Sequence, residues 1–110
     1  MYELVMDWNT KQTTELIDAL LALKDRGQAR RFLRDLMTEK ELVELGSRWA
    51  AARMLAKKVP YTEITKQTGL SSRTVARISQ WLNKGMGGYR ALINASDHTH
   101  INPLPGSGLR

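Results

Sequence analysis

The stretch of residues 61–80, YTEITKQTGLSSRTVARISQ, predicts two short helices joined by a tight turn. Gly69 suits the turn because glycine accepts a positive φ, and Ser71 or Ser72 suits the cap of the second helix. Apolar residues recur where the two helices would cross: Ile64, Leu70, Val75 and Ile78. Thr68 departs from the usual pattern, which has an apolar residue at this position. Together these features predict a helix-turn-helix.

The outer face of the predicted second helix carries side chains that suit contacts with duplex DNA. Arginine can bind guanine O6 and N7 through two hydrogen bonds, glutamine can pair with adenine, and hydroxyl groups suit phosphates or bases. The N-terminal end of the helix also presents free N–H groups to a phosphate. The candidate DNA-binding residues are Lys66, Gln67, Ser71, Ser72, Arg73, Thr74, Arg77 and Gln80. Double-stranded DNA is therefore the predicted partner.

Charge is distributed unevenly along the 110 residues, whose net charge is +6. Residues 47–94 contain nine Lys or Arg and one acid, Glu63, which gives +8, whereas residues 1–46 carry −2. A strongly basic half joined to a slightly acidic half is typical of a polyanion-binding module attached to a part with another role. The alternative is a protein-interaction module, in which the basic face of the helix-turn-helix binds an acidic protein partner.

The N-terminal part of the chain is predicted to form two helices. Asn9 and Gln12 form a capping pair for the first helix, and Gly27 is predicted to end it. The second helix is short, and its apolar stripe consists of Phe32, Leu33, Leu36 and Met37. The apolar faces of the first three helices exceed what one thin subunit can cover, so we expect an obligate homodimer formed through residues 10–56, with residues 89–94 as a further candidate segment.

A third predicted helix is the longest of the chain. Thr38 and Glu41 form a capping box that opens this helix, which runs to about Lys58. Gly46 lies inside it and costs roughly 1 kcal/mol relative to alanine, which predicts the close approach of another helix. Because no strand pattern of period two is present, the predicted fold class is all-α, a bundle of short helices.

The predicted domain organisation is simple. Residues 1–94 form a helical DNA-binding and dimerisation domain, in which the helix-turn-helix spans residues 61–83. The helix-turn-helix is followed by three glycines that interrupt the helical pattern, Gly85, Gly87 and Gly88. A short last helix is predicted after them, at Tyr89–Asn94. From Ala95 the composition changes to small and polar residues, so residues 95–110 are predicted to be a flexible tail.

Composition gives little support to an enzyme or a cofactor-binding protein. Cysteine is absent, and both histidines, His98 and His100, lie in the predicted tail, where two neutral imidazoles would bind a metal only weakly. We therefore expect no catalytic activity, no cofactor and no metal site. The chain has no apolar run near the ~20 residues of a membrane span and no secretory signal pattern, so we expect a cytoplasmic protein without a membrane partner.

Five short segments between Met37 and Ile93, about half of the chain, carry a resemblance to a known family. They are Leu45-Gly46-Ser47-Arg48-Trp49, Tyr61-Thr62-Glu63-Ile64, Thr68-Gly69-Leu70-Ser71, Thr74-Val75-Ala76-Arg77 and Gly85-Met86-Gly87-Gly88-Tyr89. The Arg-Trp pair and the Gly-x-Gly-Gly-Tyr segment are distinctive together. On these residues the chain resembles the Trp repressor superfamily, and most closely its YerC/YecD-type branch.

The resemblance implies an intertwined homodimer that regulates transcription, with each subunit offering one reading helix. It further implies a repressor that binds a palindromic operator, since Trp repressor is one of the helix-turn-helix proteins whose dimers bind two half-sites. Members of the family that bind tryptophan hold it with two arginines. Arg77 matches one of these, but Ala50 stands at the position of the other, so half of this clamp is missing and free tryptophan is not the expected effector. Arg53, three residues further along and on nearly the same helical face, is the candidate replacement, and an unidentified small-molecule effector is a further expected partner.

Overall fold

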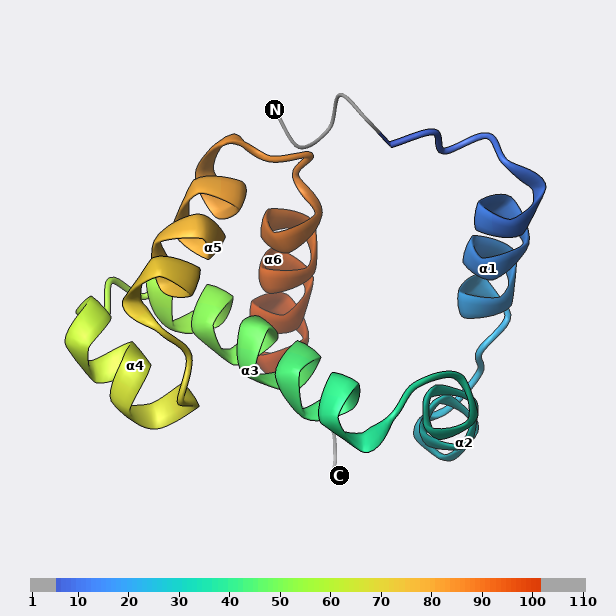
Figure 1. Ribbon diagram of the computed structural model, residues 1–110, viewed down its shortest axis with the longest axis horizontal. Coiled ribbons are helices and arrows are strands. Elements are labelled where there is room, and N and C mark those ends of the chain that lie inside the picture. The colour runs from blue at the N-terminus through green and yellow to red at the C-terminus, as the bar shows by residue number, and fades with distance from the viewer. Residues whose placement is uncertain (1–5, 102–110) are drawn as a thin grey trace. The chain divides into compact units, whose positions relative to one another are not determined.

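The computed structural model describes residues 6–101, which form six α-helices and no strand (Figure 1). They are α1 (Lys11–Leu21), α2 (Arg26–Leu36), α3 (Glu39–Ala56), α4 (Tyr61–Thr68), α5 (Ser72–Lys84) and α6 (Gly88–Ile101). This order confirms the predicted all-α class. None of the described helices combines the length and the hydrophobicity that a membrane span requires.

The chain divides into two compact units, Met1–Leu42 and Val43–Arg110, with the boundary inside α3. In the first unit, α1 and α2 contain no buried residue. Large apolar side chains are exposed there instead: Met6, Trp8, Leu16, Ile17, Leu20, Leu21 and Leu36. The described part of the first unit therefore has no buried apolar core of its own.

The caps of α1 and α2 differ from those predicted. Thr10, not Asn9, caps α1, because its hydroxyl accepts a hydrogen bond at 3.2 Å from a backbone N–H of the first turn. Asp25 caps α2 by accepting from the backbone N–H of Gln28 at 2.8 Å. Gly27 consequently lies in the first turn of α2, and the prediction that it ends the first helix is wrong.

The start of α3 is formed as predicted. The backbone N–H of Thr38 donates to Glu41 Oε1 at 2.9 Å, and the backbone N–H of Glu41 donates to Thr38 Oγ1 at 3.1 Å. This reciprocal pair confirms the capping box. The predicted helix approach at Gly46 is wrong within this chain, because a Cβ added there would meet no atom within 4 Å.

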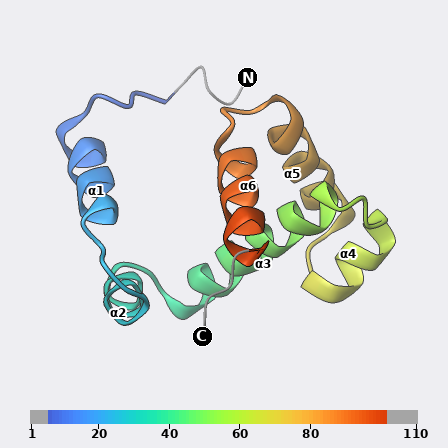
Figure 2. The ribbon, with the colours of Figure 1, turned by 180° about the vertical axis from the view of Figure 1, so that it is seen from behind.

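The second unit has a small apolar core to which α3, α4, α5 and α6 contribute. Figure 2 shows these helices from behind. Its buried residues are Ala51 and Ala52 from α3, Ile64 from α4, Val75, Ile78 and Leu82 from α5, and Ile93 from α6. Helix α5 packs against both α4 and α6. Because α5 supplies three of the buried side chains, it is the central helix of this unit.

The last helix is longer than predicted. Helix α6 runs from Gly88 to Ile101, so the prediction that it ends near Asn94 is wrong. The rest of the predicted tail, residues 102–110, lies outside the described residues, as do the side chains of His98 and His100. Among the described side chains, no group of three or more His, Cys, Asp or Glu is placed to hold a metal ion.

Candidate nucleic-acid interface

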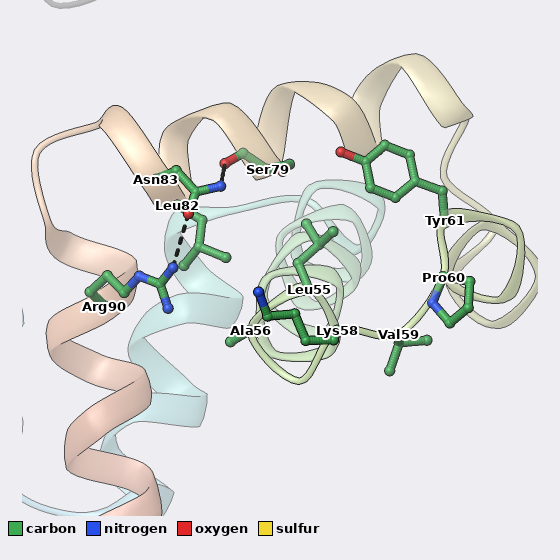
Figure 3. A pocket seen from close by; sticks show the side chains of 10 residues that line it. All are labelled: Leu55, Ala56, Lys58, Val59, Pro60, Tyr61, Ser79, Leu82, Asn83 and Arg90. Atoms are coloured by element: carbon green, nitrogen blue, oxygen red, sulfur yellow. Dashed lines mark hydrogen bonds between the residues drawn. The ribbon is translucent and has the colours of Figure 1, made fainter.

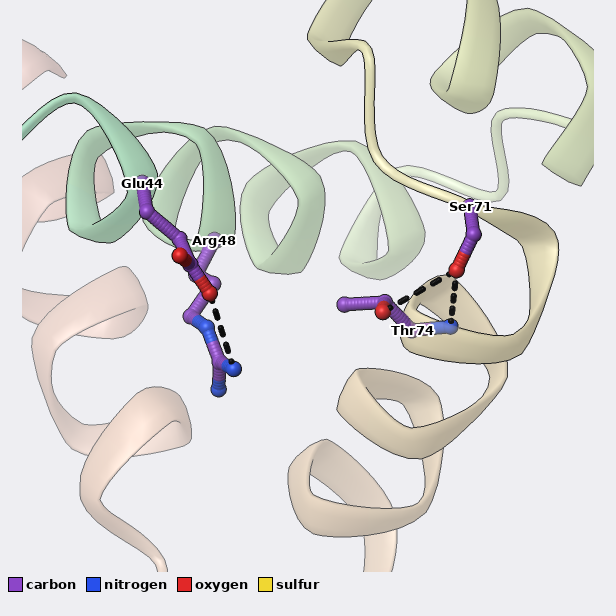
Figure 4. A network of polar contacts seen from close by, with 4 residues as sticks. All are labelled: Glu44, Arg48, Ser71 and Thr74. Atoms are coloured by element: carbon purple, nitrogen blue, oxygen red, sulfur yellow. Dashed lines mark hydrogen bonds and ion pairs between the residues drawn. The ribbon is translucent and has the colours of Figure 1, made fainter. Parts of the chain in front are cut away.

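The turn between α4 and α5 is fixed by local interactions. Gly69 has φ 78° and ψ 0°, the left-handed conformation, and its N–H donates to the carbonyl oxygen of Thr65 at 2.9 Å. Ser71 caps α5, because its Oγ accepts from the backbone N–H of Thr74 at 3.1 Å (Figure 4). The roles predicted for Gly69 and Ser71 are confirmed, and the open choice between Ser71 and Ser72 is settled in favour of Ser71.

Thr68, the residue that departs from the usual apolar pattern, has a role in the turn. Its hydroxyl donates to the carbonyl oxygen of Ile64 at 2.7 Å and accepts from the backbone N–H of Leu70 at 3.2 Å. Leu70 follows the left-handed residue, so its N–H lies outside both helices. Thr68 therefore supplies the hydrogen-bond partner that this backbone group needs where an apolar side chain could not.

The position of α5 is set by its apolar face. Val75 and Ile78 are fully buried, Leu82 is 4% exposed, and fully buried Ile64 of α4 lies in the same cluster. Intervals of three and four residues place Val75, Ile78 and Leu82 on one side of the helix. The opposite side of α5 is consequently turned away from the core.

Three of the predicted DNA-binding residues, Arg73, Arg77 and Gln80, lie on this outward side, and most of the others are exposed elsewhere on the motif. The exposed ones are Lys66, Gln67, Ser71, Ser72, Arg73, Arg77 and Gln80, and Thr74 is half-buried. Arg73, Arg77 and Gln80 are four and three residues apart, so they share one face of α5. In the described part of the chain, no hydrogen bond or ion pair involves the side chains of these three residues. Three other predicted residues are already engaged: Ser71 and Thr74 in the cap, and Gln67 with Glu63.

The electrostatic character of the motif is basic. Helix α5, with the sequence SRTVARISQWLNK, contains no acidic residue. Glu63, the one acid of residues 47–94, lies on α4, where its Oε2 accepts a hydrogen bond at 2.7 Å from the amide of Gln67. A basic face without acids attracts a polyanion and lacks the charges that would repel one.

One contact between α3 and α5 was missed by the sequence analysis. The guanidinium of Arg48 lies 5.9 Å from the centre of the Trp81 ring and also pairs with Glu44 at 3.3 Å (Figure 4). Such a cation–π contact helps to hold α5 against α3. Trp49 similarly stacks on Tyr89 of α6 at a ring-centre distance of 6.3 Å. No local pattern signals the Arg48 contact, because the two residues are far apart in the sequence.

The two arginines predicted for an effector pocket, Arg53 and Arg77, are both exposed. Neither lines a pocket of about 470 Å³ in the second unit (Figure 3). Its walls come instead from the end of α3, the start of α4, the second half of α5 and Arg90 of α6. A role of Arg53 and Arg77 in effector binding stays a prediction.

An all-α chain whose α4, turn and α5 have this geometry is a helix-turn-helix protein. The family model described as "Trp repressor protein" matches residues 11–97, and the chain belongs to this family. It is 34% identical to the uncharacterized protein YerC of Bacillus subtilis (strain 168) over 89 residues, which are 81% of this chain and 86% of YerC. Membership in the family suggests a DNA-binding regulator, since the family consists of regulators and not of enzymes.

Solved structures agree with this assignment. A TrpR-like protein from Eubacterium eligens ATCC 27750 superposes with a TM-score of 0.79 at 32% identity, over 82% of this chain and 93% of that protein. A candidate Trp repressor from Staphylococcus aureus superposes with a TM-score of 0.78 at 27% identity, over 84% of this chain and 95% of that protein. Each superposition covers more than nine-tenths of the related protein, so this chain shares its fold with both of them.

Proposed function

We propose that this protein is a transcriptional repressor that binds a palindromic operator as a homodimer and reads its sequence with α5. The observation that carries the proposal is the exposed face of α5, on which Arg73, Arg77 and Gln80 make no hydrogen bond or ion pair within the described chain while the opposite face is fixed in the core. A helix held in this way can enter a major groove without losing internal contacts.

The side chains suggest a division of roles at the DNA. Arg73 and Arg77 are the residues best suited to guanine, and Gln80 to adenine, because these pairs form two hydrogen bonds each. Lys66 and Ser72, which flank the turn, suit phosphates, as do the N–H groups at the start of α5. Ser71, Thr74 and Gln67 have intramolecular hydrogen bonds and support the motif from within.

A second copy of the chain is the partner that the first unit needs. Helices α1 and α2 bury no residue, and Leu21 is 79% exposed. Apolar surface of this extent on a small protein marks an interface. In a symmetric dimer two copies of α5 would reach half-sites one helical turn apart, roughly 34–36 Å, or a multiple of this, which is why the operator should be a palindrome.

The experiment starts with selection of bound duplexes from a random pool, followed by anisotropy measurements on the selected operator. Arg73→Ala and Arg77→Ala should each weaken operator binding by about 1–3 kcal/mol and relax specificity at one position. Lys66→Ala should weaken binding to all sequences alike and reduce the salt slope by about 1. Arg30→Ala, which removes an exposed cation of α2, is the matched control and should bind normally.

Two results would count against the proposal. If Arg73→Ala and Arg77→Ala both bind the operator as tightly as the wild type, α5 is not the reading helix. If the wild type shows no salt-dependent binding to duplex DNA at all, the basic face serves the alternative function, binding of an acidic protein.

A further inference from the structure

The pocket of about 470 Å³ in the second unit is lined by apolar, polar and basic side chains (Figure 3). Leu55, Val59 and Leu82 are among the residues that give it an apolar wall. Lys58 and Arg90 bring two positive charges to it, and none of its ten lining residues is acidic. Its volume lies within the range of ligand pockets in proteins, and its lining is polar and apolar in about equal parts.

Lys58 occupies a strained backbone position at the end of α3. Its N–H donates to the carbonyl oxygen of Leu55 at 3.0 Å, and the N–H of Val59 donates to that of Met54 at 3.0 Å. This pair of bonds is the Schellman motif, whose left-handed residue is usually glycine. Lys58 is that residue here, with φ 67°, and no other described non-glycine residue has a positive φ. Strain of this kind is concentrated at functional sites, and here it is borne by a pocket-lining cation.

Arg90 is held in place by a short chain of hydrogen bonds. Its Nη2 donates to Asn83 Oδ1 at 2.9 Å, and the Nδ2 of Asn83 donates to the carbonyl oxygen of Ser79 at 2.9 Å. The guanidinium is therefore oriented before any ligand binds, and its remaining N–H groups have no partner among the described residues. In Figure 3 the ammonium of Lys58 points toward the side of the pocket on which Arg90 lies.

We infer that this pocket binds a small organic anion, with its carboxylate or phosphate held by Lys58 and Arg90 and its apolar body against Leu55, Val59 and Leu82. Two cations with no acidic partner in the described chain attract an anionic group. An oriented guanidinium can bind a carboxylate or phosphate through two parallel hydrogen bonds. The apolar wall adds affinity for a ligand with a hydrocarbon part. The pocket shares no residue with the predicted DNA contacts, so this inference goes beyond the proposed function.

The test is a titration of the DNA-free protein followed by NMR of its backbone amides. The probe is 4-phenylbutyrate, and the control ligand is its uncharged amide, 4-phenylbutanamide. The carboxylate should shift amides around residues 55–61, 79–83 and 90 in a saturable way at millimolar concentration or below. The amide should bind on the order of tenfold more weakly, because it cannot make charge-assisted bonds to both cations.

Variants test whether the two charges contribute to binding independently of the stability of the fold. Lys58→Gly and Arg90→Gln should each weaken 4-phenylbutyrate binding on the order of tenfold, a value that allows for solvent exposure of both groups. Lys58→Gly should be at least as stable as the wild type, since glycine relieves the positive φ, so its weaker binding would not come from unfolding. Lys84→Gln removes an exposed cation of α5 that does not line the pocket and should bind normally.

The inference would be overturned by any of three results. The first is the absence of saturable shifts at the pocket. The second is equal affinity for the carboxylate and the amide. The third is the same change in affinity in Lys84→Gln as in Lys58→Gly and Arg90→Gln, which would show that the charges at the pocket have no specific role. None of these results bears on DNA binding, so failure here leaves the proposed function untouched.

Discussion

Replacing Gly69 with alanine tests how far the reading motif depends on one backbone conformation. Gly69 has φ 78°, and a Cβ added there would meet no atom within 4 Å, so no steric clash with another residue contributes. The left-handed conformation costs an L-residue about 1–2 kcal/mol. Alanine also lowers the entropy of the unfolded chain, which offsets roughly 0.4–1 kcal/mol of this cost. We therefore expect Gly69→Ala to destabilise the protein by about 1 kcal/mol.

The assay is equilibrium unfolding in urea at a fixed protein concentration, because the stability of the proposed dimer would depend on concentration. Gly69→Asn should lose less than Gly69→Ala, since asparagine visits the left-handed region more readily. Gly46→Ala is the matched control: its Cβ also meets no atom within 4 Å, but it lies inside α3, so it should stabilise by roughly 1 kcal/mol. The reasoning is refuted if Gly69→Ala unfolds at the wild-type urea concentration, or if the two alanine variants shift in the same direction.

Two further variants test the core and the turn by the same unfolding assay. Ile78→Ala removes a fully buried side chain at the centre of the second unit and should cost about 2–5 kcal/mol; a loss below 1 kcal/mol would mean that α5 is not packed as described. Thr68→Val keeps the shape of the side chain but leaves the backbone N–H of Leu70 unpaired, which should cost about 1–3 kcal/mol, whereas the exposed Thr62→Val should be near neutral. Equal stabilities of Thr68→Val and Thr62→Val would contradict the role given to Thr68.

The helix-turn-helix could be predicted because its signals are local. Gly69 and Ser71 act on backbone groups within four residues of themselves, and the buried face of α5 follows from the helical period alone. The capping box of Thr38 and Glu41 was predictable for the same reason. In each case the interaction joins residues close together in the sequence, so the residue types and their spacing are sufficient to predict it.

Other features could not be predicted, because they depend on competition or on distant contacts. Gly27 and Asp25 both signal a helix boundary, and the structure uses Asp25, whose side chain pairs with a backbone N–H that would otherwise lack a partner. The end of α6 was placed too early because Ala95–Ile101 has a loop-like composition. Extending an existing helix by one residue is far easier than starting one, so a weak sequence can continue it.

The pocket also could not be predicted from the sequence, because distant residues form it. Lys58 and Arg90 are 32 positions apart in the sequence and become neighbours of one cavity only through the packing of α3, α5 and α6. The sequence analysis instead chose Arg77 by its match to a family pattern and Arg53 as a replacement for the missing second arginine, and neither residue lines this pocket. The spacing of two cations in the sequence does not show whether they lie close together when they belong to different helices.

The two units also imply that folding and DNA reading are linked in the proposed homodimer. Helices α1 and α2 have eleven residues each, and isolated helices shorter than ~12–15 residues are only marginally stable in water. With no buried residue of their own, they would gain from the second copy of the proposed homodimer the apolar surface that they lack. Association should therefore order the first unit and bring two copies of α5 together in one step. A change that weakens the α1 face, although remote in sequence from Arg73 and Arg77, should then lower operator affinity in proportion to the loss of dimer.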